Sequence, residues 1–243
     1  MILITMAGLS SRFFKAGYLQ PKYKLELNGT SVFSHSVLSF KHYFSTEPFV
    51  FVVRDVHDTP TFVENEARKL GIADFKIIIL NEETRGQAET AYLALKNYND
   101  DFPIYIFNID TFRHAYKKPN FIDQCDGYLE VFRAEGNHWS FVLPNGQNDV
   151  IRTTEKDRIS DLCSDGLYYF KQKSVFEALF LDALKHERTV RGEYYIAPLY
   201  NELIERGATV KFDIIELDQI DFCGTPEEYQ LLLDRHSDST DKR

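Results

Sequence analysis

The chain has 243 residues, 44% of them hydrophobic, and carries 28 Lys and Arg against 37 Asp and Glu. The formal charge of −9 disfavours general affinity for nucleic acid or anionic membranes, and no apolar run approaches the roughly 18 residues that cross a bilayer. The three cysteines are far apart, no HxxxH spacing occurs and the N-terminus has no signal-peptide pattern, so we expect a cytoplasmic protein without a disulfide framework or a zinc site.

Short apolar runs alternate with amphipathic segments through the first half of the chain. Strands that are apolar along their whole length, each followed by a helix, are typical of a parallel sheet covered on both faces. The pattern therefore predicts a Rossmann-like α/β fold. The expected strands lie at 2–5, 49–53, 75–80 and 104–107, and the expected helices at 31–44, 60–71 and 86–97.

The second half has shorter strand candidates separated by turn residues such as Pro144-Asn145-Gly146. This spacing predicts a small antiparallel subregion attached to the main sheet. No internal repeat or low-complexity linker interrupts the chain, so we expect a single domain over 1–236, followed by a polar tail over 237–243. The expected strands lie at 128–132, 139–143, 150–154, 167–170 and 210–215, and the helices at 174–187, 195–206 and after Pro226.

The first strand opens into a loop of small residues that ends at Arg12, and Lys22 follows after Pro21. Small residues let a phosphate approach backbone N–H groups, and the two cations supply charge that the backbone lacks. The loop therefore predicts a nucleotide-phosphate site; the alternative is an ordinary strand-to-helix turn with solvated cations. The other loop residues expected to contact the nucleotide are Met6, Ala7, Gly8, Leu9, Ser10 and Ser11.

Asp110 follows the strand at 104–107, at the edge of the sheet where the first strand also ends. Ligands of open α/β sheets bind at the carboxyl ends of the strands, so this carboxylate is placed to hold Mg²⁺ beside the phosphates. The alternative is that Asp110 caps a turn. Gln87 and Ala88 open the helix at 86–97, where an amide can read a base edge and a small residue admits a flat ligand, although a well-packed helix start is equally consistent.

Charged residues of the second half form a candidate site for a second substrate. Glu155-Lys156 combines a carboxylate, which accepts hydrogen bonds from hydroxyls or amines, with a cation for a phosphate. A solvated charge pair is the alternative. Asp165-Gly166 follows ten residues later, and Glu193 belongs to an Arg-Gly-Glu segment.

In this order the motifs resemble those of the nucleotidyltransferases that join an NTP to a sugar phosphate or a similar phosphate and release pyrophosphate. The resemblance covers nearly the whole chain. It implies the GT-A-like form of the Rossmann-like fold, with a mixed, mainly parallel central sheet flanked by helices and a small antiparallel acceptor-binding subregion. The matching segments are Gly8 to Arg12, Pro21-Lys22, Asp110, Glu155-Lys156, Ser164 to Phe170, Arg191-Gly192-Glu193 and Gly224 to Glu227.

The resemblance also implies roles, with a nucleotide-binding half over 1–115 and an acceptor-binding half over 116–236. Arg12 and Lys22 would bind the triphosphate and Asp110 would hold Mg²⁺, which makes these three the expected catalytic residues. Asp221 is the expected second metal ligand, although relatives carry that aspartate one position later, where this chain has Phe222. The expected acceptor-binding residues are Glu155, Lys156, Asp165, Gly166 and Glu193.

The stretch from His138 to Phe170 resembles a subgroup associated with bacterial capsule and surface-polysaccharide biosynthesis. Some members of that subgroup are cytidylyltransferases that act on phosphoglutamine or phosphocholine. The resemblance thus implies CTP, Mg²⁺ and a small phosphorylated acceptor, with no nucleic-acid or membrane partner and with a homo-oligomer left open. The alternatives are a glycosyltransferase that uses a nucleotide-sugar donor, for which Asn108-Ile109-Asp110 gives half of a DxD motif, and a non-catalytic regulatory subunit.

Overall fold

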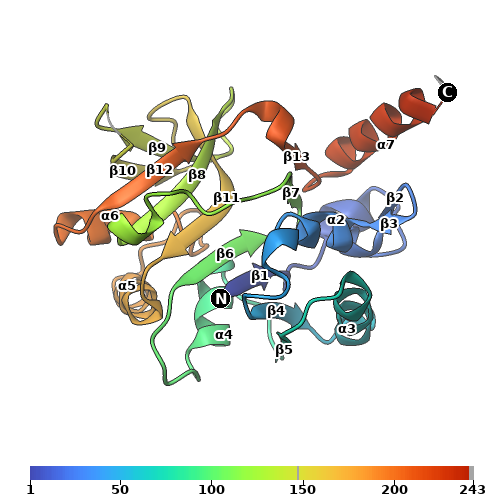
Figure 1. Ribbon diagram of the computed structural model, residues 1–243, viewed down its shortest axis with the longest axis horizontal. Coiled ribbons are helices and arrows are strands. Elements are labelled where there is room, and N and C mark those ends of the chain that lie inside the picture. The colour runs from blue at the N-terminus through green and yellow to red at the C-terminus, as the bar shows by residue number, and fades with distance from the viewer. Residues whose placement is uncertain (147, 241–243) are drawn as a thin grey trace.

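A mixed sheet forms the centre of the protein in the computed structural model, which describes residues 1–146 and 148–240 (Figure 1). Its strand order over these residues is β10-β9-β11-β6-β1-β4-β5, with β8 paired to β11 and β12 paired to β8. The strands of this sheet are β1 (Ile2–Thr5), β4 (Phe49–Arg54), β5 (Phe75–Leu80), β6 (Ile104–Asn108), β8 (Gly127–Arg133), β9 (Ser140–Pro144), β10 (Val150–Glu155), β11 (Leu162–Phe170) and β12 (Val210–Ile214).

The part of the sheet built from β6, β1, β4 and β5 is parallel, with Ile2 of β1 paired to Phe49 on one side and Tyr105 on the other. Strands β1 and β4 are buried on both faces, which explains their continuous apolar sequence. The sheet changes direction at β11, which pairs antiparallel with β6 and continues into the antiparallel subregion. The predicted fold class is confirmed.

Helices cover both faces of the sheet and create two hydrophobic cores (Figure 1). On one face Leu95 of α4, Phe176 of α5 and Leu203 of α6 pack together, and on the other face Phe33 of α2 packs with Val63 of α3. The helices are α1 (Ser11–Lys15), α2 (Val32–Leu38), α3 (Thr59–Leu70), α4 (Gln87–Leu95), α5 (Lys173–Lys185), α6 (Leu199–Glu205) and α7 (Pro226–Thr240), with single 3-10 turns η1 (Lys22–Lys24), η2 (Lys41–Tyr43), η3 (Ile122–Gln124) and η4 (Leu217–Gln219).

Two predicted helices are shorter than expected because tertiary contacts redirect the backbone. The helix expected over 31–44 ends at Leu38, where the Oγ of Ser39 accepts a hydrogen bond from the Arg113 N–H and the following ring, Phe40, packs on Phe107. The helix expected over 195–206 begins only at Leu199, since the preceding backbone bonds to the loop at 85–88.

Four short strands were not expected from the sequence and form two small antiparallel pairs. Strand β2 (Glu26–Leu27) pairs with β3 (Thr30–Ser31) across Asn28-Gly29, and both residues of this turn have positive φ. Strand β7 (Thr111–Arg113) pairs with β13 (Ile220–Phe222). The second pair brings the C-terminal segment to the end of β6, where Asp110 lies.

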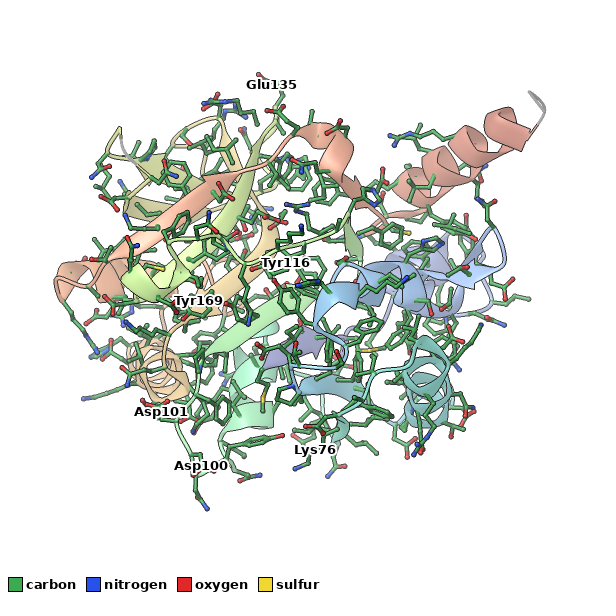
Figure 2. The ribbon with its side chains drawn as sticks, in the orientation of Figure 1. Lys76, Asp100, Asp101, Tyr116, Glu135 and Tyr169 are labelled. Atoms are coloured by element: carbon green, nitrogen blue, oxygen red, sulfur yellow. The ribbon has the colours of Figure 1, made fainter. Side chains whose placement is uncertain are left out.

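The C-terminal helix α7 projects beyond the rest of the chain in Figure 1. It continues to Thr240 and so includes part of the predicted polar tail, whereas residues 241–243 of that tail lie outside the described residues. Figure 2 shows Tyr116 and Tyr169 in the interior, with Glu135, Lys76 and Asp100 at the periphery. No helix in the described part of the chain is long and apolar enough to span a bilayer.

Candidate active site

A cleft of about 680 Å³ opens at the carboxyl ends of β1 and β6 and extends along β11 to the antiparallel subregion. This volume suits small-molecule ligands. The predicted residues that line the cleft are Met6, Ala7, Gly8, Leu9, Ser10, Ser11, Arg12, Lys22, Gln87, Asp110, Glu155, Asp165, Gly166 and Glu193. Segments distant in the sequence therefore meet around one space.

The loop at 6–12 presents backbone N–H groups at one end of the cleft. Ser10 has a left-handed conformation with φ of 53°, and its Oγ accepts a hydrogen bond of 3.2 Å from the Lys22 N–H, which fixes the loop against η1. Among the described residues, no protein group accepts a hydrogen bond from the N–H groups of residues 7–12. Such a run of unpaired donors next to cations suits an anion rich in oxygen atoms.

Lys22 and Asp110 form an ion pair between this loop and the end of β6. The Nζ of Lys22 lies 2.5 Å from Oδ2 of Asp110, and both side chains are largely but not fully covered. Burial alone would raise the pKa of Asp110, but the charge and hydrogen bond of Lys22 outweigh it and lower that pKa below its usual range. Asp110 is thus held as a carboxylate facing the cleft.

The turn before α7 lies against Asp110. The Cys223 N–H donates 2.8 Å to the Asp110 carbonyl, and the space that a side chain at Gly224 would fill is bounded by Asp110 Oδ2 and by Oε2 of Glu228. Glu228 also accepts hydrogen bonds from the N–H groups of Gly224 and Thr225, and so caps the start of α7. Glu228 is a cleft residue that the sequence reasoning did not select.

An amide pair forms the floor of the cleft between the two strand ends. The Nε2 of Gln87 donates 2.5 Å to Oδ1 of Asn108 and 3.2 Å to Oγ1 of Thr5. Gly166, with φ of +92°, lies so close that a Cβ there would be 2.3 Å from Nδ2 of Asn108. The β11 bulge at Gly166 therefore packs against Asn108, the residue that bonds to Gln87 in the cleft.

The other end of the cleft has aromatic and acidic side chains. Glu155 is 8% exposed and accepts a hydrogen bond from the Ser140 hydroxyl, which also lies 3.1 Å from the Tyr168 hydroxyl. Burial raises the pKa of Glu155 despite the opposing effects of Ser140 and Lys156. Trp139 and Phe222 line the same end, with ring centroids 4.9 Å apart.

Lys156 lies beside this end but does not line the cleft as the described residues define it. Its ammonium donates to the Tyr195 hydroxyl and lies 4.4 Å from the centre of that ring. Lys156 has a left-handed φ of 56° and directly follows Glu155, the last residue of β10. Of the expected Glu155-Lys156 pair, Glu155 therefore lines the cleft, whereas Lys156 bonds to Tyr195.

Asp165, an expected acceptor-binding residue, lines the cleft with a side chain that is buried. The residue is 0% exposed, and its Oδ1 accepts 2.9 Å from the Leu167 N–H. Burial and the adjacent Glu130 carboxylate hold the pKa of Asp165 well above its usual range, while Glu130 is paired with Arg113 at 2.5 Å. The Asp165 side chain therefore packs in the interior, where the raised pKa favours its protonated form.

Asp221 does not join Asp110 in the cleft, in contrast to its expected role as second metal ligand. Its carboxylate is held at 2.9 Å by both His114 and Arg235. Successive side chains of a strand face opposite ways, so on β13 the residue that reaches the cleft is Phe222. No group of three metal-binding side chains occurs in the described ranges.

Ala88 also departs from its expected nucleotide contact. It lies in the first turn of α4, is fully buried in the core, and donates a hydrogen bond of 3.1 Å from its N–H to the Tyr194 carbonyl. The cleft-lining residues that sequence reasoning did not place in the site include Trp139, Tyr168, Tyr195, Phe222 and Glu228. The aromatic residues among them lie on strands or loops. The direction of their side chains depends on contacts with residues that are distant in the sequence.

Comparison with known proteins identifies structures with the same fold. No protein-family profile and no curated protein sequence matches the chain. Two solved structures share its fold at low identity: the inositol-1-phosphate CTP transferase from T. maritima, with 16% identity over 95% of this chain and 94% of the other and a TM-score of 0.72, and the CTP:phosphocholine cytidylyltransferase from Streptococcus pneumoniae, with 14% identity over 96% and 97% and a TM-score of 0.71.

A third structure is much more similar. The nucleoside-diphosphate-sugar pyrophosphorylase from Vibrio cholerae RC9 shares 48% sequence identity, covers 96% of this chain and 100% of its own, and superposes with a TM-score of 0.93. Identity of this extent over nearly all of this chain and all of the other joins the two chains in one family. The protein described here belongs to the nucleoside-diphosphate-sugar pyrophosphorylase family of nucleotidyltransferases.

Proposed function

We propose that the protein transfers a cytidylyl group from CTP to a small phosphorylated acceptor and releases pyrophosphate. The acceptor is a sugar phosphate or a small non-sugar phosphate such as phosphoglutamine or phosphocholine, and the product serves capsule or surface-polysaccharide biosynthesis. The observation that carries the proposal is the Lys22–Asp110 pair, which lies between a loop of free N–H groups and the remainder of a long cleft.

The loop end of the cleft supports binding of the triphosphate. The N–H groups of 7–12 can donate to phosphate oxygens, and Arg12 is an exposed cation at the end of the same loop. Lys22 is fixed on η1 with its ammonium at the end of β6, between the loop and the acceptor end. We therefore assign Arg12 to the β and γ phosphates and Lys22 to the α-phosphate.

The residues present also fit Mg²⁺. This cation takes one or two carboxylates together with phosphate oxygens and water, so one well-placed carboxylate is sufficient from the protein. Asp110 is ionised and faces the cleft beside the free N–H groups, and Glu228 lies on the other side of Gly224. Asp110 would hold the ion; when bound, Mg²⁺ neutralises triphosphate charge.

The transfer reaction requires the protein mainly to position the two substrates and to stabilise the negative charge of their phosphates. An oxygen of the acceptor phosphate attacks the α-phosphorus of CTP, a new P–O bond forms, and the bond from the α-phosphorus to the bridging oxygen breaks as pyrophosphate leaves. The second pKa of a phosphate monoester is about 6, so the acceptor is largely a dianion at neutral pH and needs no general base. Lys22 stabilises the charge that develops on the α-phosphate oxygens.

The choice of CTP is supported by the resemblance of residues 138–170 to a subgroup that includes cytidylyltransferases. It is tested by measuring pyrophosphate release from ATP, GTP, CTP, UTP and dTTP, each with a panel of sugar, choline and amino-acid phosphates. We expect CTP to give the highest kcat/KM. Equal or faster release with another NTP would contradict the choice of CTP but not nucleotidyl transfer itself, and no release with any pair would contradict both.

A further inference from the structure

We propose that β5 is an interface between two copies of this chain, which pair antiparallel along this strand about a two-fold axis. Strand β5 is the last in the strand order of the sheet, so its edge away from β4 has no neighbouring strand within the described residues. Figure 1 shows β5 at the lower margin of the molecule, between α4 and α3. It lies two strands away from β1, at the end of which the cleft opens, and its pairing does not depend on the proposed transfer reaction.

The free edge of β5 offers backbone hydrogen-bonding groups to another strand. In a parallel pair, successive residues direct their N–H and C=O groups alternately to the two sides of the strand. The Phe49 N–H donates 2.9 Å to the Asp74 carbonyl, so the even-numbered residues of β5 face β4. The odd-numbered residues Phe75, Ile77 and Ile79 therefore direct their backbone groups outward, where no described residue bonds to them.

Strand β5 lacks the features that usually prevent pairing at an edge. Its six residues include no proline or glycine, and its register with β4 continues without a bulge. Its one charged side chain, Lys76, is held with the ammonium 5.0 Å from the centre of the Tyr98 ring. An edge of this kind, with three consecutive isoleucines, favours pairing with another strand.

Apolar side chains on both faces of β5 are partly open to a partner. On the face that packs against α4, Ile78 borders a groove of about 300 Å³ whose other lining residues include Leu93 and Ala94. On the opposite face, Ile79 is 46% exposed. A second copy of β5 would remove Ile79 from water and place an apolar side chain at the groove.

The charges that flank β5 favour a second copy in antiparallel orientation. Lys76 lies near the start of the strand and Glu82 follows its end, and neither forms an ion pair with any residue of the described ranges. In an antiparallel pair of identical strands, Lys76 of each copy can lie opposite Glu82 of the other. Ile79 is midway between these positions and then lies on the two-fold axis. A parallel pair in register would instead bring Lys76 against Lys76.

The backbone pattern is consistent with this register. Ile79 is one of the residues whose N–H and C=O groups face outward, so two copies of Ile79 on the axis exchange two reciprocal hydrogen bonds. Opposite residues of antiparallel strands share a face, so Leu80 of one copy lies beside Ile78 of the other, at the groove. Charge, backbone and side-chain shape therefore favour the same arrangement.

Sedimentation velocity of the full chain, from about 1 µM to about 500 µM, tests whether the pair forms. A contact made mainly by one strand pair is smaller than a standard interface of about 1,600 Å², so we expect a Kd of about 10 to 100 µM. The mass should rise with concentration from 28.3 kDa toward that of a dimer. The monomer mass over the whole range would overturn the self-pairing and leave the edge to a different partner.

Variants locate the contact. Ile79→Lys places two ammonium groups at the axis and should raise Kd at least about tenfold. Ile151→Lys is the matched control, because Ile151 is 50% exposed on β10, at the other end of the sheet, and this change should leave Kd unaltered. Circular dichroism and thermal unfolding show whether both variants are folded. A dimer that persists in folded Ile79→Lys, or that Ile151→Lys weakens equally, would overturn the assignment to β5.

A charge exchange tests the orientation. Lys76→Glu and Glu82→Lys should each weaken the dimer, and the double variant should restore it, because the opposite charges then meet again across the axis. Ile79→Cys should form a covalent dimer on mild oxidation, whereas the wild-type chain, whose three cysteines are buried, should not. Further weakening in the double variant, or no cross-link in Ile79→Cys, would contradict the antiparallel register.

Discussion

The Lys22–Asp110 pair is the residue-scale feature on which the proposed chemistry depends most. The sequence placed Arg12, Lys22 and Asp110 together because each follows a buried strand or its loop, and parallel strands end at the same edge. The 2.5 Å contact shows how closely that reasoning located two of them.

Asp110→Asn should lower kcat by at least about a hundredfold, because the neutral amide loses charge at the site that we propose for the triphosphate and Mg²⁺. The free energy of unfolding should change by only about 1 kcal/mol, since the pair retains access to water. Steady-state pyrophosphate release and urea unfolding measure the two effects. Near-wild-type turnover in Mg²⁺ would rule out the metal assignment.

Asp165 is predicted to make stability depend on pH. Its pKa is raised by burial beside Glu130, so folding takes up a proton; this stability is fully present below the ordinary Asp pKa of about 4 and is lost as pH rises toward the raised value. Asp165→Asn should therefore lose less stability than wild type between pH 5 and pH 8, by up to about 1.4 kcal/mol per pH unit.

Urea unfolding at several pH values measures this difference, and Asp218→Asn, at an exposed position, is the control that should follow wild type. Parallel pH profiles for wild type and Asp165→Asn would show that Asp165 is ionised in the folded protein. The sequence alone suggested an acceptor contact here, because the depth of a β11 side chain depends on β8, which supplies Glu130.

At the scale of elements, the long buried strands and the glycine-terminated α3 were predictable, because their patterns are local. The β7–β13 pair was not, since each strand has three residues and they lie more than a hundred positions apart. This pair decides that Phe222 rather than Asp221 faces the cleft. The β2–β3 hairpin does have a local sequence signal, because Asn28-Gly29 is a dipeptide that favours a tight turn with positive φ at both residues.

The β11 bulge is predicted to support the nucleotide end of the cleft through Gly166. Gly166→Ala should cost about 1 kcal/mol through its positive φ and should also displace Asn108 and weaken the bond to Gln87, with a loss in kcat/KM. Gly207→Ala is the matched control, because Gly207 has φ of +82° with open space around its Cβ direction. Gly207→Ala should lower the stability of the protein but leave kcat/KM unchanged.

Thermal unfolding and pyrophosphate release on both variants make this comparison. Equal activity of Gly166→Ala and Gly207→Ala would show that Asn108 adjusts without consequence for the cleft.

At the scale of the whole molecule, one continuous sheet joins the two expected halves. Strand β6 pairs with β1 of the first half and with β11 of the second, and the core under α4, α5 and α6 includes residues from both. Alternating apolar and amphipathic segments predicted this fold, because the pattern recurs along the chain. The position of the cleft was predictable from the ends of the parallel strands. The aromatic side chains of Trp139 and Phe222 in its wall were not predictable, because their placement depends on tertiary packing.

The shared sheet predicts that the chain unfolds as one cooperative unit, since neither half retains its full core without the other. Scanning calorimetry should show a single transition whose calorimetric and van't Hoff enthalpies agree. Two separate transitions would indicate that residues 1–115 and 116–236 are independent domains.

The most direct test of the central claim follows the oxygen atoms of the transfer reaction. The acceptor, labelled with ¹⁸O in the non-bridging oxygens of its phosphate, is incubated with CTP, Mg²⁺ and the protein, and the products are examined by ³¹P NMR and mass spectrometry. Attack of the acceptor phosphate on the α-phosphorus predicts that all label stays in the cytidylyl product and that the pyrophosphate is unlabelled. Labelled pyrophosphate, or release of a nucleoside diphosphate in its place, would contradict the claim.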